Sequence, residues 1–210
     1  MKIICNICYK ETILGPEEKE KYFPNDPDDS IRYSECKECR YKRLCLELPL
    51  IYRDAVDDYN VMAKLDINKS YFFYGDTGAG KTFSAIEILK RRWKNGQSGR
   101  FISYPELIFS IQTNYEQNAE MVDEIKKYKQ LIILDDFGAE KMTDFVRQVS
   151  YLIINYREQN KLQTIITSNF TLDEIDMYID RRISSRIAGM CEIIRMSGDK
   201  RLNQKGGLEC

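Results

Sequence analysis

One eight-residue segment of the chain has the residue types and the spacing of a loop that binds a polyphosphate. The segment Gly75-Asp-Thr-Gly-Ala-Gly-Lys-Thr82 fits the P-loop pattern G-x-x-x-x-G-K-[ST] at every position. The glycines let backbone N–H groups face phosphate oxygens, Lys81 can reach the β- and γ-phosphates, and the Thr82 hydroxyl can hold Mg²⁺. The predicted nucleotide-binding residues are Gly75, Asp76, Thr77, Gly78, Ala79, Gly80, Lys81 and Thr82.

The residues that flank this segment predict the elements that must position it. Tyr71-Phe-Phe-Tyr74 is short, aromatic and strand-like, and residues 81–94 are typical of a helix. A strand, a glycine loop and a helix N-terminus together point amide N–H groups and the positive end of the helix dipole at an anion. The alternative is a glycine-rich turn that matches the pattern by chance. This context and a second motif downstream disfavour it.

The second motif is a run of four apolar residues, Leu131-Ile-Ile-Leu134, followed by Asp135 and Asp136. A buried parallel strand ends in this way at the sheet edge that carries ligands. We expect Asp135 to bind Mg²⁺ through its water shell, and Asp136 to orient or polarise the water that attacks the γ-phosphate. Taken alone, the same residues would equally describe a strand capped by two solvated acids.

Polar residues further along the chain could complete the site. The strand predicted over 163–168 is followed by Asn169, whose amide would lie beside the γ-phosphate if this strand neighbours the P-loop strand. On its own, Asn169 is better explained as a helix N-cap, a role that Thr171 could also fill. Arg182 and Arg186 are four residues apart on one helix face. Either could act as an arginine finger in a neighbouring subunit's site, or belong to a solvated basic face.

Apolar runs alternate with helical patterns from about residue 50 to residue 200, which predicts a βαβ sheet. We predict strands at 70–74, 100–104, 131–135, 163–168 and 191–196, and helices at 54–64, 81–94, 105–114, 118–129, 142–159, 172–178 and 180–188. The fold class is therefore α/β, a parallel sheet flanked by helices. The predicted domains are a cysteine-rich N-terminal domain over 1–47, a nucleotide-binding domain over 48–201 and a flexible tail over 202–210.

Taken in order, these segments resemble the DnaC/IstB group of AAA+ ATPases, in particular the DnaC/DnaI-type replicative helicase loaders with an N-terminal zinc-binding domain. The resemblance covers about residues 47 to 201, and it is carried by residues 48–55, 134–141, 154–157, 167–169, 182–190 and 197–201. It implies the AAA+ type of P-loop NTPase fold. A full helical lid domain is not expected, because the chain ends soon after Arg201.

The resemblance also implies roles for individual residues. It makes Lys81 and Thr82 the Walker A pair, Asp135 and Asp136 the Walker B acids, Asn169 sensor 1, Arg186 the arginine finger with Arg182 second, and Arg201 a weak candidate for sensor 2. The second Walker B acid is Asp where the broader AAA+ pattern more often has Glu. An arginine finger acts on the next subunit's nucleotide, so the resemblance implies self-association into an open ring or spiral.

Two CxxC pairs near the N-terminus have the spacing of a metal site. Cys5 and Cys8 form one pair, and Cys36 and Cys39 form the other. Four thiolates of this kind suit a structural Zn²⁺ ion. A domain this small and polar would need the roughly 10–16 kcal/mol that structural zinc can supply. Free thiols and an iron–sulfur site are the alternatives, and Cys45 could replace one ligand.

Composition excludes several classes of function. The 210 residues include no histidine, which rules out a Ser-His-Asp triad and any His-containing metal site. The net charge of −1 gives no bulk basicity, so nucleic acid would have to bind a local patch, for which the lysines at 126–129 are a candidate. There is no apolar run of membrane-spanning length and no signal peptide, so we expect a cytoplasmic protein that does not contact membranes.

The leading hypothesis is an ATP-dependent helicase loader for DNA replication. Residues 1–47 would bind the replicative helicase, and the ATPase core would bind ATP, Mg²⁺ and single-stranded DNA. One alternative is an IstB-like transposition helper ATPase, which shares nearly all of the core motifs. A second is an ATP-gated adaptor that binds nucleotide and scarcely hydrolyses it.

Overall fold

The computed structural model describes residues 2–13, 31–53, 65–114 and 116–198. The chain forms two compact units, residues 1–54 and residues 55–210. Three predicted features lie outside the described residues. They are the helix over 54–64, the candidate Arg201 and the tail over 202–210, which includes Cys210. None of the described helices combines the length and the apolar composition that crossing a bilayer requires.

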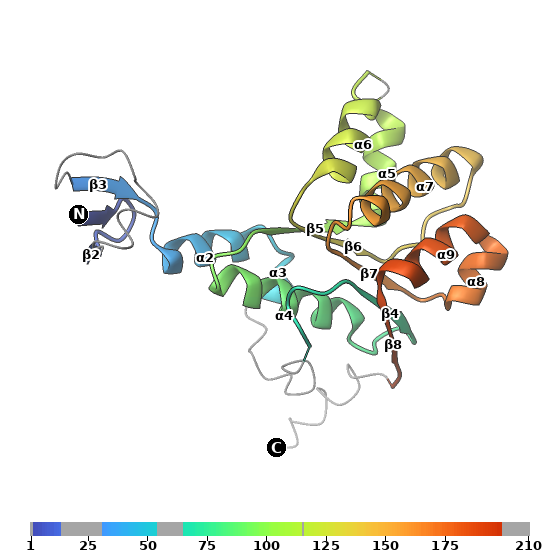
Figure 1. The fold of residues 1–210 in the computed structure, drawn as a ribbon, viewed down its shortest axis with the longest axis horizontal. Helices are drawn as coiled ribbons and strands as arrows, with labels where there is room; N and C mark the ends of the chain where they lie inside the picture. The colour runs from blue at the N-terminus through green and yellow to red at the C-terminus, as the bar shows by residue number, and fades with distance from the viewer. Residues whose placement is uncertain (1, 14–30, 54–64, 115, 199–210) are drawn as a thin grey trace, which may run out of the picture. The chain divides into compact units, whose positions relative to one another are not determined.

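The larger unit is built on a five-stranded sheet in which every pairing is parallel (Figure 1). Its strands are β4 (Tyr71–Gly75), β5 (Gly99–Ser103), β6 (Leu131–Asp135), β7 (Thr164–Ser168) and β8 (Glu192–Met196). They lie in the order β5-β6-β7-β4-β8. The predicted strands and their parallel arrangement are thus confirmed to within a residue at either end. The strand that enters the P-loop has a neighbour on both sides.

Six described helices accompany this sheet. They are α4 (Lys81–Lys94), α5 (Tyr104–Thr113), α6 (Asn118–Lys127), α7 (Asp144–Gln159), α8 (Leu172–Tyr178) and α9 (Arg181–Met190). Local capping explains where two of them, α7 and α9, begin. The Thr143 hydroxyl accepts from the Val146 N–H, so α7 begins after Thr143. Asp180 accepts from the Arg182 N–H in the same way and is the cap of α9 rather than its first residue.

The two faces of the sheet are covered differently. Helix α4 packs against β4, β5, β6 and β7, and α5 to α9 pack on one another around a buried core (Figure 1). Alternate strand residues supply that core, including Phe72, Ile132 and Ile166, which are all fully buried. Strand residues point to opposite faces in turn, so a strand buried on both sides reads as one continuous apolar run.

Arg157 on α7 is fully buried, although its side chain carries a charge. Its guanidinium donates to the Thr164 hydroxyl at 2.9 Å and to the carbonyl oxygens of Ile125, Tyr128, Gln130 and Gln163 at 2.7 to 3.2 Å. No carboxylate pairs with it among the described residues. Burial lowers the pKa of Arg157 to about 10, so the side chain stays charged at neutral pH. This one residue therefore holds the end of α6, the start of β6 and the start of β7 together.

We predict that Arg157→Lys destabilises the larger unit by about 3 kcal/mol or more, because an ammonium cannot span the acceptors that the planar guanidinium reaches and would leave buried carbonyls unpaired. Urea unfolding monitored by the fluorescence of Trp93, the single tryptophan, would measure this change. The exposed control Arg181→Lys should stay within about 0.5 kcal/mol of the parent. A loss of less than 1 kcal/mol for Arg157→Lys would show that the network contributes little.

The described residues of the smaller unit form a short sheet and two helices. Its strands are β1 (Lys2–Cys5), β2 (Glu11–Ile13) and β3 (Ile31–Ser34), in the order β2-β1-β3. Strand β1 is antiparallel to β2 and parallel to β3. Helices α2 (Lys37–Leu46) and α3 (Leu50–Arg53) follow. The sheet is too small to enclose a large apolar core, so its stability must have another source.

Candidate functional site

The P-loop connects the end of β4 to the start of α4. Gly80 precedes the helix with a φ of +89°, in the left-handed region that glycine enters at little cost. Gly75 ends the strand beside β8, and a Cβ atom there would lie 1.9 Å from the Met196 carbonyl oxygen. The first glycine of the motif is therefore required by the close approach of the neighbouring strand, and a later one by the backbone turn.

The Lys81 side chain joins the P-loop to the end of a different strand. Its buried ammonium donates to the carbonyl oxygens of Gly75 and Asp76 and to Oδ1 of Asn169, each at 2.8 Å. Asn169 is 88 positions further along the chain and arrives here because β7 pairs with β4. The structure thus brings together the two residues that sequence analysis placed at the γ-phosphate.

Asp135 ends β6 as a buried carboxylate. Burial raises the pKa of Asp135 to about 6, and hydrogen bonds from the hydroxyls of Thr167 and Thr82 oppose that rise. Thr167 donates to Oδ1 of Asp135 at 2.7 Å. No lysine or arginine forms an ion pair with Asp135 among the described residues. A buried carboxylate beside a threonine hydroxyl is an oxygen donor set that suits Mg²⁺, so Thr82 and Asp135 fit the role predicted for them.

Asp136 is exposed and adopts a left-handed backbone conformation with a φ of +57°. Its backbone N–H donates to the Thr167 hydroxyl at 2.9 Å, and the next N–H, that of Phe137, donates to the Thr167 carbonyl at 2.8 Å. Thr167 therefore positions both predicted Walker B acids. Sequence analysis missed this role, and the available signal was the pair of hydroxyl residues, Thr167 and Ser168, that follows the two isoleucines of this strand.

The structure decides which residue caps the helix after β7. Thr171 accepts from the Glu174 N–H at 3.1 Å, and the Glu174 carboxylate accepts from the Thr171 N–H at 2.7 Å, which makes a complete capping box. Asn169 is not the cap, so its side chain is available to Lys81. A cleft of about 500 Å³ opens beside these groups, lined by Tyr74, Gly75, Asp76, Thr77, Asn169, Thr171, Glu174 and Arg195.

Arg182 and Arg186 lie away from this cleft, on the side of α9 that faces α7. Arg186 donates to Oδ1 of Asn155 at 2.6 Å and to the Tyr151 hydroxyl at 3.2 Å. Arg182 is bound to Asp180 at 2.7 Å, and both guanidinium groups lie over the Tyr151 ring, at 4.4 and 4.9 Å from its centroid. Neither arginine contacts the P-loop of its own chain within the described residues.

The two CxxC pairs converge in the smaller unit. The sulfur atoms of Cys5, Cys8, Cys36 and Cys39 all lie within 4.8 Å of one another. The Cys8 and Cys36 sulfurs are 3.7 Å apart. Four thiolates around a tetrahedral zinc ion at about 2.3 Å would be about 3.8 Å apart, so the cluster fits this metal.

The backbone around the cluster favours the thiolate form of Cys5, whereas the pKa of Cys39 is raised by its hydrogen bonds to neighbouring thiols and by burial. The N–H groups of Ile7 and Cys36 donate to the Cys5 sulfur at 3.4 Å. Hydrogen bonds from the backbone at Cys8 and Cys36 lower the pKa of Cys5 to about 6. Cys45 is buried in α2 and does not belong to the converging group. Cys191 is a buried core thiol.

Comparison with known proteins identifies the family. The family described as IstB-like ATP binding protein matches residues 53–206. The chain belongs to this family. The resemblance found in the sequence is therefore confirmed, together with the AAA+ type of α/β fold.

Individual relatives of this IstB-like protein include helicase loaders. The replicative helicase loader DnaI of Bacillus subtilis (strain 168) is 29% identical over 162 residues, which cover 70% of this chain and 51% of that protein. The uncharacterized protein YqaM of the same organism is 29% identical over 166 residues, 74% of this chain and 53% of its own length. The chain spans about half the length of the curated relatives it matches.

Solved structures agree on the fold. The crystal structure of the DnaC helicase loader matches with a TM-score of 0.57 and 26% identity, over 65% of this chain and 84% of that one. The crystal structure of DnaI matches with a TM-score of 0.58 over 77% of this chain and 99% of that one. At 24% identity, the DnaI structure supports the fold alone.

We predict that the purified IstB-like protein carries about one zinc ion per chain, because four convergent thiolates bind this metal strongly. Cys36→Ser should lower the zinc content several-fold, whereas Cys45→Ser should retain it. Elemental analysis after dialysis would measure both. Folded parent protein without metal, or equal loss in the two variants, would contradict a site made of Cys5, Cys8, Cys36 and Cys39.

Proposed function

We propose that this protein is an ATP-dependent loader of a replicative helicase, acting in the cytoplasm during DNA replication. The observation that carries the proposal is the Lys81–Asn169 contact of 2.8 Å next to the buried Asp135, because this arrangement suits a triphosphate and its metal ion. The family and the loaders among its relatives support the biological role.

Each site residue then has a defined task. Gly75–Thr82 would hold the triphosphate with backbone N–H groups, and Thr82 and Asp135 would hold the magnesium ion, which neutralises phosphate charge when bound. Lys81 would move one or more of its hydrogen bonds from loop carbonyls to phosphate oxygens. Asn169 would orient the attacking water through its amide. The chain has no histidine, so Asp136 is the residue assigned to polarise that water.

We expect Lys81→Ala to lower ATP affinity at least tenfold and to abolish turnover, because the ammonium is the only P-loop side chain that brings positive charge to the β- and γ-phosphates. Calorimetry and a phosphate-release assay would measure the two effects. The control Lys94→Ala, at the other end of α4, should leave both unchanged. Unaltered ATP affinity in Lys81→Ala would rule out this site.

Self-association into a ring or spiral is part of the proposal. Arg186 and Arg182 do not contact the P-loop of their own chain. The Arg186 guanidinium is nevertheless fixed in position, because it donates hydrogen bonds to Asn155 and Tyr151 on α7. A guanidinium fixed in this way loses little conformational freedom on meeting the γ-phosphate of an adjacent subunit. Arg186 is therefore proposed as the finger, with Arg182 beside it.

We predict that Arg186→Ala slows ATP turnover at least tenfold while ATP affinity changes less than twofold, because the finger acts on a different subunit's nucleotide. Mixing this variant with Lys81→Ala subunits should restore part of the activity, since each supplies what the other lacks. Steady-state turnover at varied mixing ratios would measure the recovery. Activity that never exceeds the sum of the two variants would argue against a shared site.

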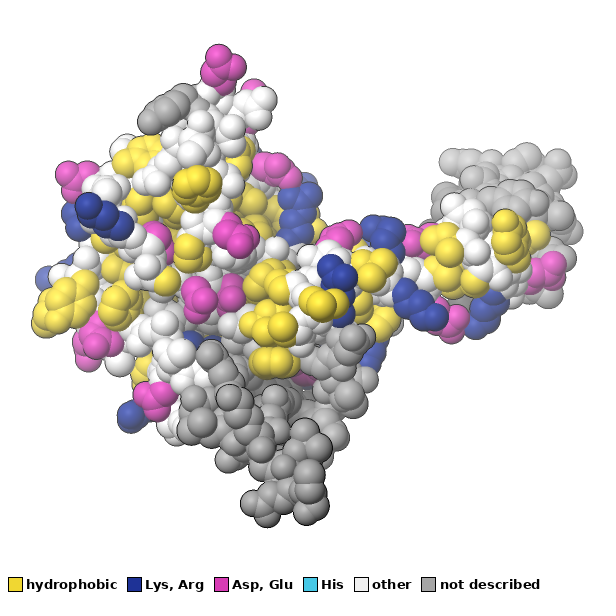
Figure 2. Space-filling model, turned by 180° about the vertical axis from the view of Figure 1, so that it is seen from behind, with side chains coloured by type: hydrophobic (Ala, Val, Ile, Leu, Met, Phe, Trp, Pro, Cys, Tyr) yellow, Lys and Arg dark blue, Asp and Glu magenta, His cyan; other side chains and the backbone are white. Residues whose placement is uncertain are grey.

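The partners are proposed separately from the ATP site. Residues 1–47, with the zinc-binding cysteines, are proposed to contact the helicase. Single-stranded DNA is proposed as a ligand of the ATPase domain (48–201). The lysines that the sequence offered for it do not form an unpaired basic patch among the described residues. Lys126 and Lys127 on α6 both pair with Asp123. On the face that Figure 2 shows, basic and acidic side chains are interspersed.

A transposition helper is the second candidate, favoured by the IstB-like family match. Affinity capture with a purified hexameric helicase and with a transposase would separate the two roles. The third candidate, an adaptor that scarcely hydrolyses ATP, would show ATP binding without turnover in the presence of single-stranded DNA.

A further inference from the structure

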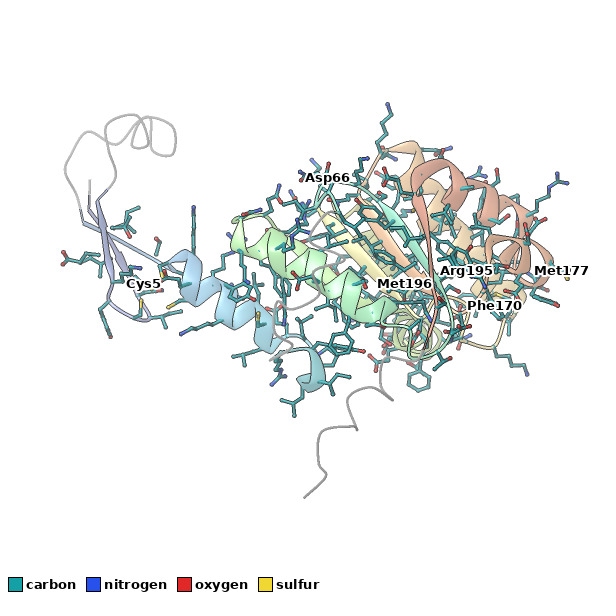
Figure 3. All side chains as sticks on the ribbon, turned by 90° about the horizontal axis from the view of Figure 1, so that it is seen from below. Cys5, Asp66, Phe170, Met177, Arg195 and Met196 are labelled. Atoms are coloured by element: carbon teal, nitrogen blue, oxygen red, sulfur yellow. The ribbon has the colours of Figure 1, made fainter. Side chains whose placement is uncertain are left out.

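Arg195 lies at the edge of the sheet, next to the P-loop strand. It precedes the last residue of β8, and in the strand register Arg195 is opposite Tyr74 and Met196 is opposite Gly75. Figure 3 labels Arg195 and Met196 at this end of the strand. Strand order therefore brings an arginine from near the end of the described chain to the first residue of the phosphate-binding loop.

The cleft beside the P-loop contains this arginine. Arg195 shares the lining of that cleft with the loop residues Gly75, Asp76 and Thr77 and with Asn169. Asn169 in turn accepts from the Lys81 ammonium at 2.8 Å. The cleft is thus lined both by Arg195 and by Asn169, the residue expected beside the last phosphate of a bound triphosphate.

The Arg195 guanidinium has no ion-pair or hydrogen-bond partner among the described residues, and it is exposed. Several other described arginines are paired, as Arg182 is with Asp180 and Arg100 is with Glu124. Glu174 is the other charged residue from outside the loop in the same cleft, and its carboxylate already accepts from the Thr171 N–H. The N–H donors of Arg195 therefore have no acceptor among the described residues, and they are available to bind phosphate oxygens.

We infer that Arg195 binds the γ-phosphate of ATP held in the P-loop, so that β8 distinguishes ATP from ADP. The inference rests on the nucleotide site proposed above. Lys81 brings one positive charge to a terminal phosphate that carries up to two negative charges, and a second cation in a partly enclosed cleft would complete the neutralisation. The α- and β-phosphates bind the backbone amides of the loop and need no contact with β8.

The test compares two nucleotides on the full chain. Arg195→Ala and Arg195→Gln should weaken binding of a non-hydrolysable ATP analogue with Mg²⁺ about tenfold or more, because a charge-assisted bidentate contact is lost. ADP affinity should change less than twofold. Arg195→Lys should lie between these variants and the parent, since it retains the charge without the planar fork. Calorimetry measures the affinity of each variant and of the parent for both nucleotides, and exposed Arg181→Ala is the matched control that should bind both nucleotides like the parent.

The outcomes separate this inference from the proposed function. If the parent binds both nucleotides and Lys81→Ala weakens them, but Arg195→Ala changes neither or changes both equally, then the Arg195 role is wrong and the nucleotide site stands. If the parent binds no adenine nucleotide, both proposals are overturned. Preferential loss of the ATP analogue in Arg195→Ala and Arg195→Gln, with Arg181→Ala unaffected, supports the inference.

Discussion

The contact between the Lys81 ammonium and Asn169 depends on the pairing of β4 with β7, and the candidate site depends on that pairing. A lysine in a P-loop has a long, flexible side chain, and its position is defined only when acceptors surround it. Here the acceptors come from the loop itself and from the end of the adjacent strand. In parallel strands the carboxyl ends meet at one edge, so polar groups from separate segments converge there without further adjustment.

A second constraint is the cost of burying charge. Asp135, Lys81 and Arg157 are all buried, and each has a different form of compensation. Arg157 has neutral oxygen acceptors around its whole guanidinium, and these hydrogen bonds offset the cost of burying its charge in a structural role. Asp135 has hydroxyl donors and no paired cation among the described residues. Its raised pKa reflects the free-energy cost of burying the carboxylate that these hydrogen bonds do not offset. A buried acid left in this state is typical of a functional site rather than of a stabilising one.

The two units of the chain obtain their stability in different ways. The larger unit encloses an apolar core between its sheet and α5 to α9. The described part of the smaller unit has short strands and few buried apolar residues, of which Cys5, Cys45 and Leu48 are examples. Metal coordination by four convergent sulfurs would link β1, the turn after it and the start of α2, and so add to the stability that the few buried apolar residues described there provide. Nucleotide binding and metal binding are therefore assigned to separate parts of one chain.

The amino-acid sequence alone determined the motifs and the elements that carry them. The P-loop, the Asp135-Asp136 pair, the CxxC pairs and the five strands of the larger unit follow from patterns a few residues long, whereas the three strands of the smaller unit were not predicted. Only the tertiary structure decided which distant groups meet. That Asn169 contacts Lys81, that Thr167 holds both acids and that Arg195 lines the cleft are consequences of strand order. Local patterns specify what a segment becomes, whereas contacts between segments far apart in the chain depend on how the whole sheet packs.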